Sequence, residues 1–169
     1  NLSQIRHLFR QGKSVKQVKR MMRGVVNEEI AHIASYRSIS EERLATIINE
    51  TSDEDYIQIG DDYYQSKKGK TLSKERLASE DPAVVLKEKE NLIEEMFRIK
   101  AQRAMRGETS EESFHFWAKN PNLFKQIMHY LEMMVTRLKA LRANNRYSPE
   151  LSLAISNLVE ELHVMRGGE

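Results

Sequence analysis

Apolar residues recur at steps of three and four along much of this chain, which is the spacing of one face of an α-helix. Series of this kind occupy residues 85–99 and 151–165. The clearest series lies between them in the chain and consists of Ile127, Leu131, Met134, Leu138 and Leu141. The pattern predicts an all-α fold in which helices pack on helices.

Three prolines mark where the long helices are expected to begin. They follow Asp81, Asn120 and Ser148, whose side chains can accept hydrogen bonds from the free N–H groups of a first helical turn. Gly107 and Gly167 are suited to the left-handed conformation that often ends a helix. Only a few residues separate the last two helices, so these are expected to form an antiparallel hairpin.

The N-terminal part is expected to be a cluster of shorter helices. Ser3, Ser14 and Ser38 are placed to cap three of them, and Gly12 and Gly24 are placed to end the first two. These short helices precede the long-helix part of the chain.

Two segments between these parts lack a helical pattern. Residues 51–65 combine acids with tyrosines and are expected to form an acidic loop, with 56–59 as a candidate short strand. The lysine- and glycine-containing residues 66–73 have the composition of a linker. The expected organisation is therefore a basic short-helix module with an acidic loop over 1–65, a linker over 66–73, and a long-helix packing or oligomerisation module over 74–169.

A short helix that carries three aromatic residues is expected between the long ones. Thr109 and Glu112 form a capping box, and Phe114, Phe116 and Trp117 follow it. Aromatic rings dominate protein cores, so this group is expected to plug the core. A surface on which a ligand or nucleic-acid bases stack is the alternative.

Composition excludes several classes of protein. Apolar residues make up 40% and charged residues 31% of the chain, which is enough apolar surface for a core. No run approaches the roughly 18 apolar residues that a membrane span needs. Cysteine is absent, which excludes disulfides and thiolate chemistry and fits a reducing compartment. We therefore expect an intracellular protein, cytoplasmic or nuclear, with no membrane partner.

The net charge of +2 conceals a strong segregation of charge along the chain. Residues 1–24 contain seven basic residues and no acid, whereas residues 25–65 contain ten acids and two bases. The seven basic residues are Arg6, Arg10, Lys13, Lys16, Lys19, Arg20 and Arg23. They are the candidate contacts to nucleic-acid phosphates. Pairing of the basic stretch with the acidic one, inside the fold or between subunits, is the alternative.

Residues 5–33 resemble a helix-turn-helix, with two short helices, a tight turn and a candidate recognition helix over 27–36. The resemblance implies that the last helix enters the major groove of duplex DNA. Lys19 stands where such motifs usually have a small apolar residue, and Glu28 and Glu29 would repel phosphate. The charges therefore favour contacts to the nucleic-acid backbone without reading of bases.

Few features of the chain favour catalysis. It has no phosphate-binding loop, esterase motif or zinc-protease motif. The adjacent acids at 53–55 and 61–62 are more typical of a solvated loop than of a two-metal site.

Glu-x-x-His spacings, which occur in di-iron bundles, are found at Glu29–His32, Glu112–His115 and Glu160–His163. The single Glu residues that complete such a site are not evident, because residues 1–27 contain no acid. A non-enzymatic protein with no metal and no cofactor is expected, and a carboxylate–histidine metal protein is the less favoured alternative.

The expected function is that of a non-enzymatic nucleic-acid-binding helical protein, with DNA favoured over RNA, acting as an oligomeric recognition or regulatory subunit. The layout resembles that of viral genome-packaging recognition subunits and small phage-type DNA-binding regulators. Eight methionines and the wide apolar arc over 121–143 favour contact with a second copy or a helical partner. The alternative is a structural or adaptor protein that assembles through helical and charge-complementary contacts.

Overall fold

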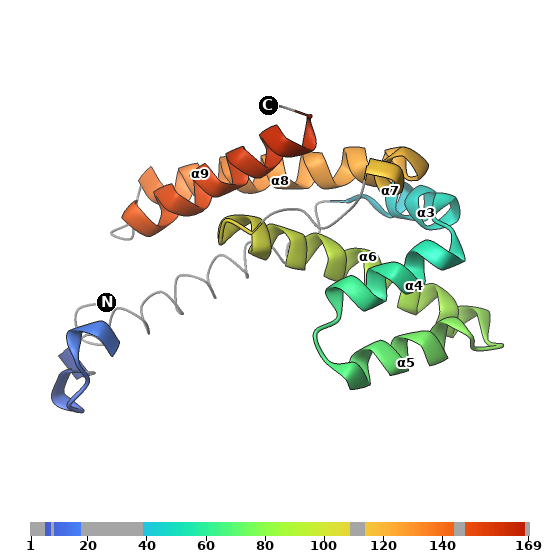
Figure 1. The fold of residues 1–169 in the computed structure, drawn as a ribbon, viewed down its shortest axis with the longest axis horizontal. Helices are drawn as coiled ribbons and strands as arrows, with labels where there is room; N and C mark the ends of the chain where they lie inside the picture. Colours follow the sequence, from blue (N-terminus) through green and yellow to red (C-terminus); the bar gives the residue numbers. More distant parts are fainter. Residues whose placement is uncertain (1–5, 8, 18–38, 109–113, 144–147, 168–169) are drawn as a thin grey trace.

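The computed structural model describes residues 6–7, 9–17, 39–108, 114–143 and 148–167, and all regular structure in these ranges is helical. The labelled helices are α3 (Glu41–Glu50), α4 (Asp53–Tyr63), α5 (Lys67–Leu77), α6 (Pro82–Met105), α7 (Phe114–Lys119), α8 (Pro121–Ala143) and α9 (Ser148–Met165). Helical residues also occur at 6–7, 9–10 and 15–17. The all-α prediction, with short helices ahead of a long-helix part, is confirmed (Figure 1).

The proline signals are confirmed. α6 begins at Pro82 and α8 at Pro121, and α9 begins one residue before Pro149. At the start of α6, the Oδ1 atom of Asp81 accepts a hydrogen bond from the N–H of Ala83 at 3.0 Å. The acid thus satisfies a backbone donor that the first turn leaves free.

α6 also ends where the sequence predicts. Gly107 has a φ of +79°, in the left-handed region. Its N–H donates to the carbonyl of Ala104 at 2.9 Å, and the N–H of Glu108 donates to the carbonyl of Arg103 at 3.0 Å. These two bonds form a Schellman cap, which depends on the left-handed glycine.

Replacing Gly107 with alanine is expected to lower the free energy of unfolding by about 1–2 kcal/mol, because a Cβ in the left-handed region crowds the following carbonyl. That Cβ would lie 3.5 Å or more from Asn157, so the cost is conformational and not a clash. Gly60→Ala is the matched control, since Gly60 lies inside α4 and its Cβ would contact Ser73 and Leu92 at ordinary distances of 3.4 and 3.5 Å. There we expect a gain of roughly 0.5–1 kcal/mol. Urea unfolding followed by circular dichroism measures both changes, and changes of the same sign would contradict this reading of Gly107.

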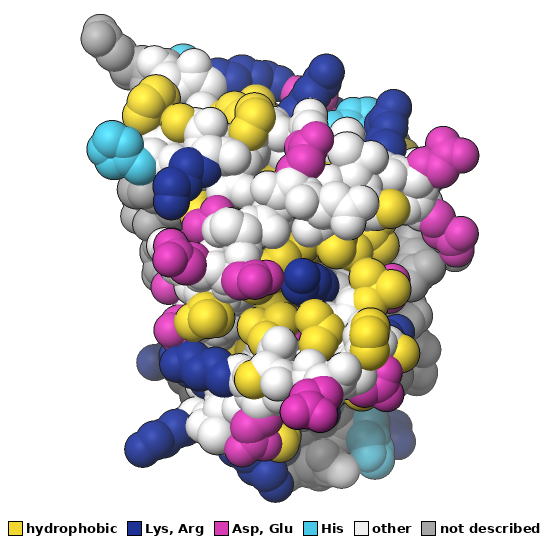
Figure 2. Space-filling model, turned by 90° about the vertical axis from the view of Figure 1, so that its right-hand side faces the viewer, with side chains coloured by type: hydrophobic (Ala, Val, Ile, Leu, Met, Phe, Trp, Pro, Cys, Tyr) yellow, Lys and Arg dark blue, Asp and Glu magenta, His cyan; other side chains and the backbone are white. Residues whose placement is uncertain are grey.

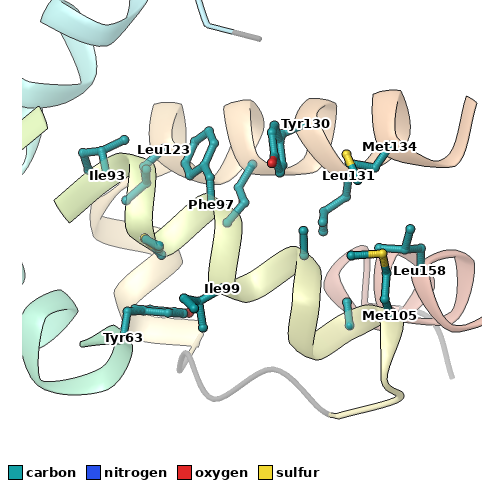
Figure 3. Close-up of a cluster of buried hydrophobic side chains, with 14 of the residues drawn as sticks. Tyr63, Ile93, Phe97, Ile99, Met105, Leu123, Tyr130, Leu131, Met134 and Leu158 are labelled. Carbon is teal, nitrogen blue, oxygen red and sulfur yellow. The ribbon is translucent and has the colours of Figure 1, made fainter. Parts of the chain in front are cut away.

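α6 lies at the centre of the packing and contacts α3, α4, α5, α8 and α9. Figure 3 shows its apolar side chains facing those of α8 and α9. The rings of Phe97 and Tyr130 lie 5.4 Å apart between centroids, and Leu131, Met134 and Leu158 are fully buried or nearly so. α8 itself contacts α3, α6, α7 and α9, so helices of the same chain cover much of the wide apolar arc that suggested a partner.

α8 and α9 lie side by side and run in opposite directions (Figure 1), which confirms the predicted antiparallel hairpin. Leu151, Ile155 and Leu158 of α9 are buried. The Nδ2 atom of Asn157 donates to the carbonyl of Met105 at 2.9 Å, so α9 also supplies a hydrogen bond to the last turn of α6.

The prediction of an acidic loop with a short strand at 56–59 is wrong, because these residues belong to helix α4. Tyr56, Ile59 and Tyr63 recur at helical spacing and are buried. The Oγ atom of Ser52 accepts from the N–H of Asp55 at 3.2 Å, and three acids occupy the first turn of α4. Negative charge is favourable there because the N-terminal end of a helix carries positive partial charge.

The prediction that residues 66–73 form an irregular linker is also wrong, because helix α5 begins at Lys67 and covers most of them. The Oγ atom of Ser66 accepts from the N–H of Gly69 at 2.9 Å and caps the helix. Ser73 is the buried residue of α5, and its hydroxyl lies close to Gly60 of α4. The hydrophobic core includes residues of α3, α4, α6, α8 and α9, so it extends across the boundary expected at 66–73.

Two of the three clustered aromatic residues join the core as expected. Phe116 is 5% exposed, and its ring meets that of Trp117 edge-on at 5.0 Å between centroids. Trp117 is half-buried and packs against Phe124 at 5.0 Å. Phe114 instead is 82% exposed.

Candidate nucleic-acid interface

Four of the seven basic residues expected to contact phosphate lie in the N-terminal ranges that the structure describes. They are Arg6, Arg10, Lys13 and Lys16, while Lys19, Arg20 and Arg23 lie outside those ranges, as does most of the helix-turn-helix resemblance. Gly12 has a φ of +77° and follows the first helical residues, as the sequence predicts. The second helical turn begins with a capping box, in which the N–H of Gln17 donates to the Oγ of Ser14 at 3.2 Å and the N–H of Ser14 donates to Gln17 at 2.9 Å.

These four basic side chains are largely accessible. Arg6, Arg10 and Lys16 are exposed, and Lys13 is half-buried. Within the ranges described for 6–17 and 39–167, with their gaps, no carboxylate forms an ion pair with any of the four. Their charges are therefore not neutralised by the described acids.

Some of the acids that could mask the basic stretch have partners elsewhere in the fold. Lys89 of α6 lies 3.5 Å from Asp53, and Lys74 of α5 lies 3.2 Å from Asp61.

A third acid of the same segment bonds to an amide. The Nδ2 atom of Asn120, between α7 and α8, donates to the buried carboxylate of Asp55 at 2.8 Å. The acidic segment therefore helps to join α4 to the helices that follow it.

The alternative reading of these acids as metal ligands gains no support from the geometry. Among the residues that the structure describes, no three His, Asp or Glu side chains gather closely enough to hold a metal ion. Glu160 and His163 are both exposed, and the spacings that involve Glu29 and Glu112 fall outside the described ranges.

Glu88 of α6 is the acid whose buried position most resembles that of a catalytic group, since it is 1% exposed. The hydroxyl of Tyr64 donates to its Oε1 at 2.7 Å, and Arg76 donates to its Oε2 at 3.2 Å. Burial, followed by the bond to Glu88, raises the pKa of Tyr64 well above its usual value, so the phenol stays protonated at neutral pH. An open hollow of about 430 Å³ lies beside Glu88 and includes Lys87 and Asn91. Both carboxylate oxygens are hydrogen-bonded, so Glu88 ties α5 and the end of α4 to α6.

α5 contains a second cluster of basic residues, with five bases and one acid, in a stretch that the sequence predicts as a linker and the start of the long-helix module. The signal that could have found this cluster is Ser66, which is an N-cap residue directly before the lysines.

In the described part of the chain, each helix is too short or too polar to cross a membrane. Comparison with protein-family models, with curated proteins and with solved structures yields no match to the chain in any of the three.

Proposed function

We propose that this chain is a non-enzymatic nucleic-acid-binding helical protein whose basic N-terminal residues contact the phosphate backbone, and that it acts as an oligomeric recognition or regulatory subunit. One observation carries the proposal: residues 1–24 contain seven basic residues and no acid. Basic side chains that neutralise phosphates release condensed counterions, which supplies binding free energy without reading of bases. Duplex DNA is the favoured partner, because the sequence of residues 5–33 resembles that of a helix-turn-helix.

The pairing of the acidic segment supports this proposal. Asp53 and Asp61 lie against Lys89 and Lys74, so part of the negative charge that could quench the N-terminal residues is engaged within the fold. Arg6, Arg10 and Lys16 are exposed and form no ion pair with an acid of the described ranges, which suits contact with a polyanion.

A mobility-shift assay of the full chain with duplex DNA, single-stranded DNA and RNA tests the proposal. We expect retention of duplex DNA at about 50 mM salt and a large loss of affinity at about 200 mM, as phosphate contacts require. If none of the three probes is retained at the lower salt concentration, the proposal is wrong.

A structural or adaptor protein is the second candidate function, and exposed apolar side chains on α9 favour it. Leu153, Val159 and Val164 are 63%, 48% and 47% exposed. Apolar groups on the outside of a helix can dock a helical partner or a second copy of the chain. Light scattering distinguishes the candidates: self-association that depends on salt, without retention on DNA, supports the adaptor.

A further inference from the structure

We propose that α5 is a second phosphate-contact surface, on which Lys67, Lys68 and Lys70 bind the backbone of the same nucleic acid. This inference rests on the proposed function, because a second contact surface requires that the chain meets nucleic acid. The α5 surface is separate from the N-terminal basic residues, because α5 packs on α4 and α6.

The basic residues of α5 follow the helix in a regular order. Lys67 and Lys70 are three residues apart, so they lie along one side of the helix, and Lys68 follows Lys67 directly. From Lys67 to Lys70 the helix rises about 4.5 Å at 1.5 Å per residue. That rise is comparable to about one phosphate step of one strand, at about 3.4 Å per step along a duplex axis.

The charge at the start of α5 is not compensated by the described acids. Lys74 pairs with Asp61 at 3.2 Å, and Arg76 pairs with Glu88 at 3.2 Å. No acid in the described ranges forms an ion pair with the three lysines of the proposed surface, which are Lys67, Lys68 and Lys70. Lys67 and Lys68 are exposed, and Lys70 is half-buried.

The surroundings of α5 also suit a polar ligand. On the face shown in Figure 2, both basic and acidic side chains lie at the lower margin, below a band of hydrophobic side chains. The exposed residues of α5 include the basic Lys67, Lys68, Lys74 and Arg76, the acid Glu75, and Leu72, which is 37% exposed. Basic residues therefore outnumber the one acid of α5.

The energetics of α5 favour an anion on this side. The first turn contains lysines and no acid, although cations are unfavourable near the N-terminal end of a helix. Lys67 and Lys70 are three residues apart, where like charges repel. Of the α5 residues, Ser73 is buried and Leu77 packs partly buried against the core. Phosphates bound along the lysines would relieve the repulsion.

The test compares two triple variants of the full chain. Lys67→Ala, Lys68→Ala and Lys70→Ala together remove the proposed surface, and alanine is compatible with the helix. The control variant, Lys119→Ala, Lys125→Ala and Lys139→Ala, removes the same charge from exposed positions at the end of α7 and on α8. Circular dichroism verifies that both variants keep the helical content of the parent.

The α5 variant is expected to bind duplex DNA on the order of 100-fold more weakly than the parent at 0.15 M salt, which corresponds to the loss of about three phosphate contacts. The slope of log K against log salt concentration should fall in magnitude by about 3, and the control should keep the slope of the parent. An α5 variant that binds like the parent overturns this inference and leaves the proposed function intact. A control that loses as much affinity as the α5 variant also overturns it, because only net charge would then matter. If the parent does not bind duplex DNA, both this inference and the proposed function are wrong.

Discussion

Replacing Lys100 with methionine is expected to lower the free energy of unfolding by about 3–5 kcal/mol, because it leaves a buried carboxylate without its cation. Lys100 of α6 and Glu161 of α9 are 4% and 5% exposed, and their charged atoms lie 3.5 Å apart. The ammonium also lies 5.4 Å from the centroid of the Trp117 ring. Methionine keeps the volume of the aliphatic chain, so the change is mainly electrostatic.

The buried position of Glu161 explains why the loss of stability should be large. The Oε1 atom of Glu161 is buried and accepts no hydrogen bond from the described residues, so the ion pair with Lys100 is its compensation there. Desolvation of two charges is costly, and the attraction between them recovers only part of that cost. The pair therefore makes the α6–α9 contact sensitive to the loss of either member.

The double variant Lys100→Met with Glu161→Leu is the control. Apolar replacement of a complete buried pair is often neutral or stabilising, so the double variant should regain most of the stability that the single variant loses. Thermal unfolding measures this by circular dichroism and by the fluorescence of Trp117, the one tryptophan of the chain. At roughly 2–4 °C per kcal/mol, the single variant should unfold about 6–20 °C below the parent. A single variant as stable as the parent would show that the ion pair contributes nothing.

Replacing Lys16, Lys19 and Arg20 together with alanine is expected to weaken binding to duplex DNA on the order of 100-fold at 0.15 M salt. Each lost phosphate contact reduces the salt slope by about 0.9, and three contacts account for the change in affinity. The loss should be nearly the same for duplexes of different sequence, because phosphate contacts carry no base information. Fluorescence anisotropy with two unrelated duplexes measures both properties.

The variant with Lys119, Lys125 and Lys139 replaced by alanine serves again as the control, since it removes three positive charges from other exposed positions. Equal losses in the two variants, or an N-terminal variant that binds like the parent at low salt, contradict the assignment of the basic face.

Local signals in the sequence were enough to predict the long helices. Pro82 and Pro121 mark helix starts, and Gly107 marks a helix end, because each acts on the backbone within one turn. α4 and α5 were missed because their buried sides depart from an aliphatic pattern. α4 buries Tyr56 and Tyr63 among acids, and α5 buries Ser73.

The sequence was enough to predict the basic residues of the candidate site, but not which side chains pair with the acidic segment. The seven basic residues within 1–24 are visible directly in the sequence. The partners of the acidic segment are not, because the pairs Asp53–Lys89 and Asp55–Asn120 join residues 36 and 65 positions apart. Such contacts depend on how α4 packs on α6 and on the junction of α7 and α8, which composition does not specify.

The most direct measurement is the affinity of the full chain for one duplex DNA over a series of salt concentrations. If most of the seven N-terminal basic residues neutralise phosphates, the plot of log K against log salt concentration should be linear with a slope of about −4 to −6. A slope near zero, or no binding at the lowest salt concentration, would contradict the account and leave a helical assembly protein in its place.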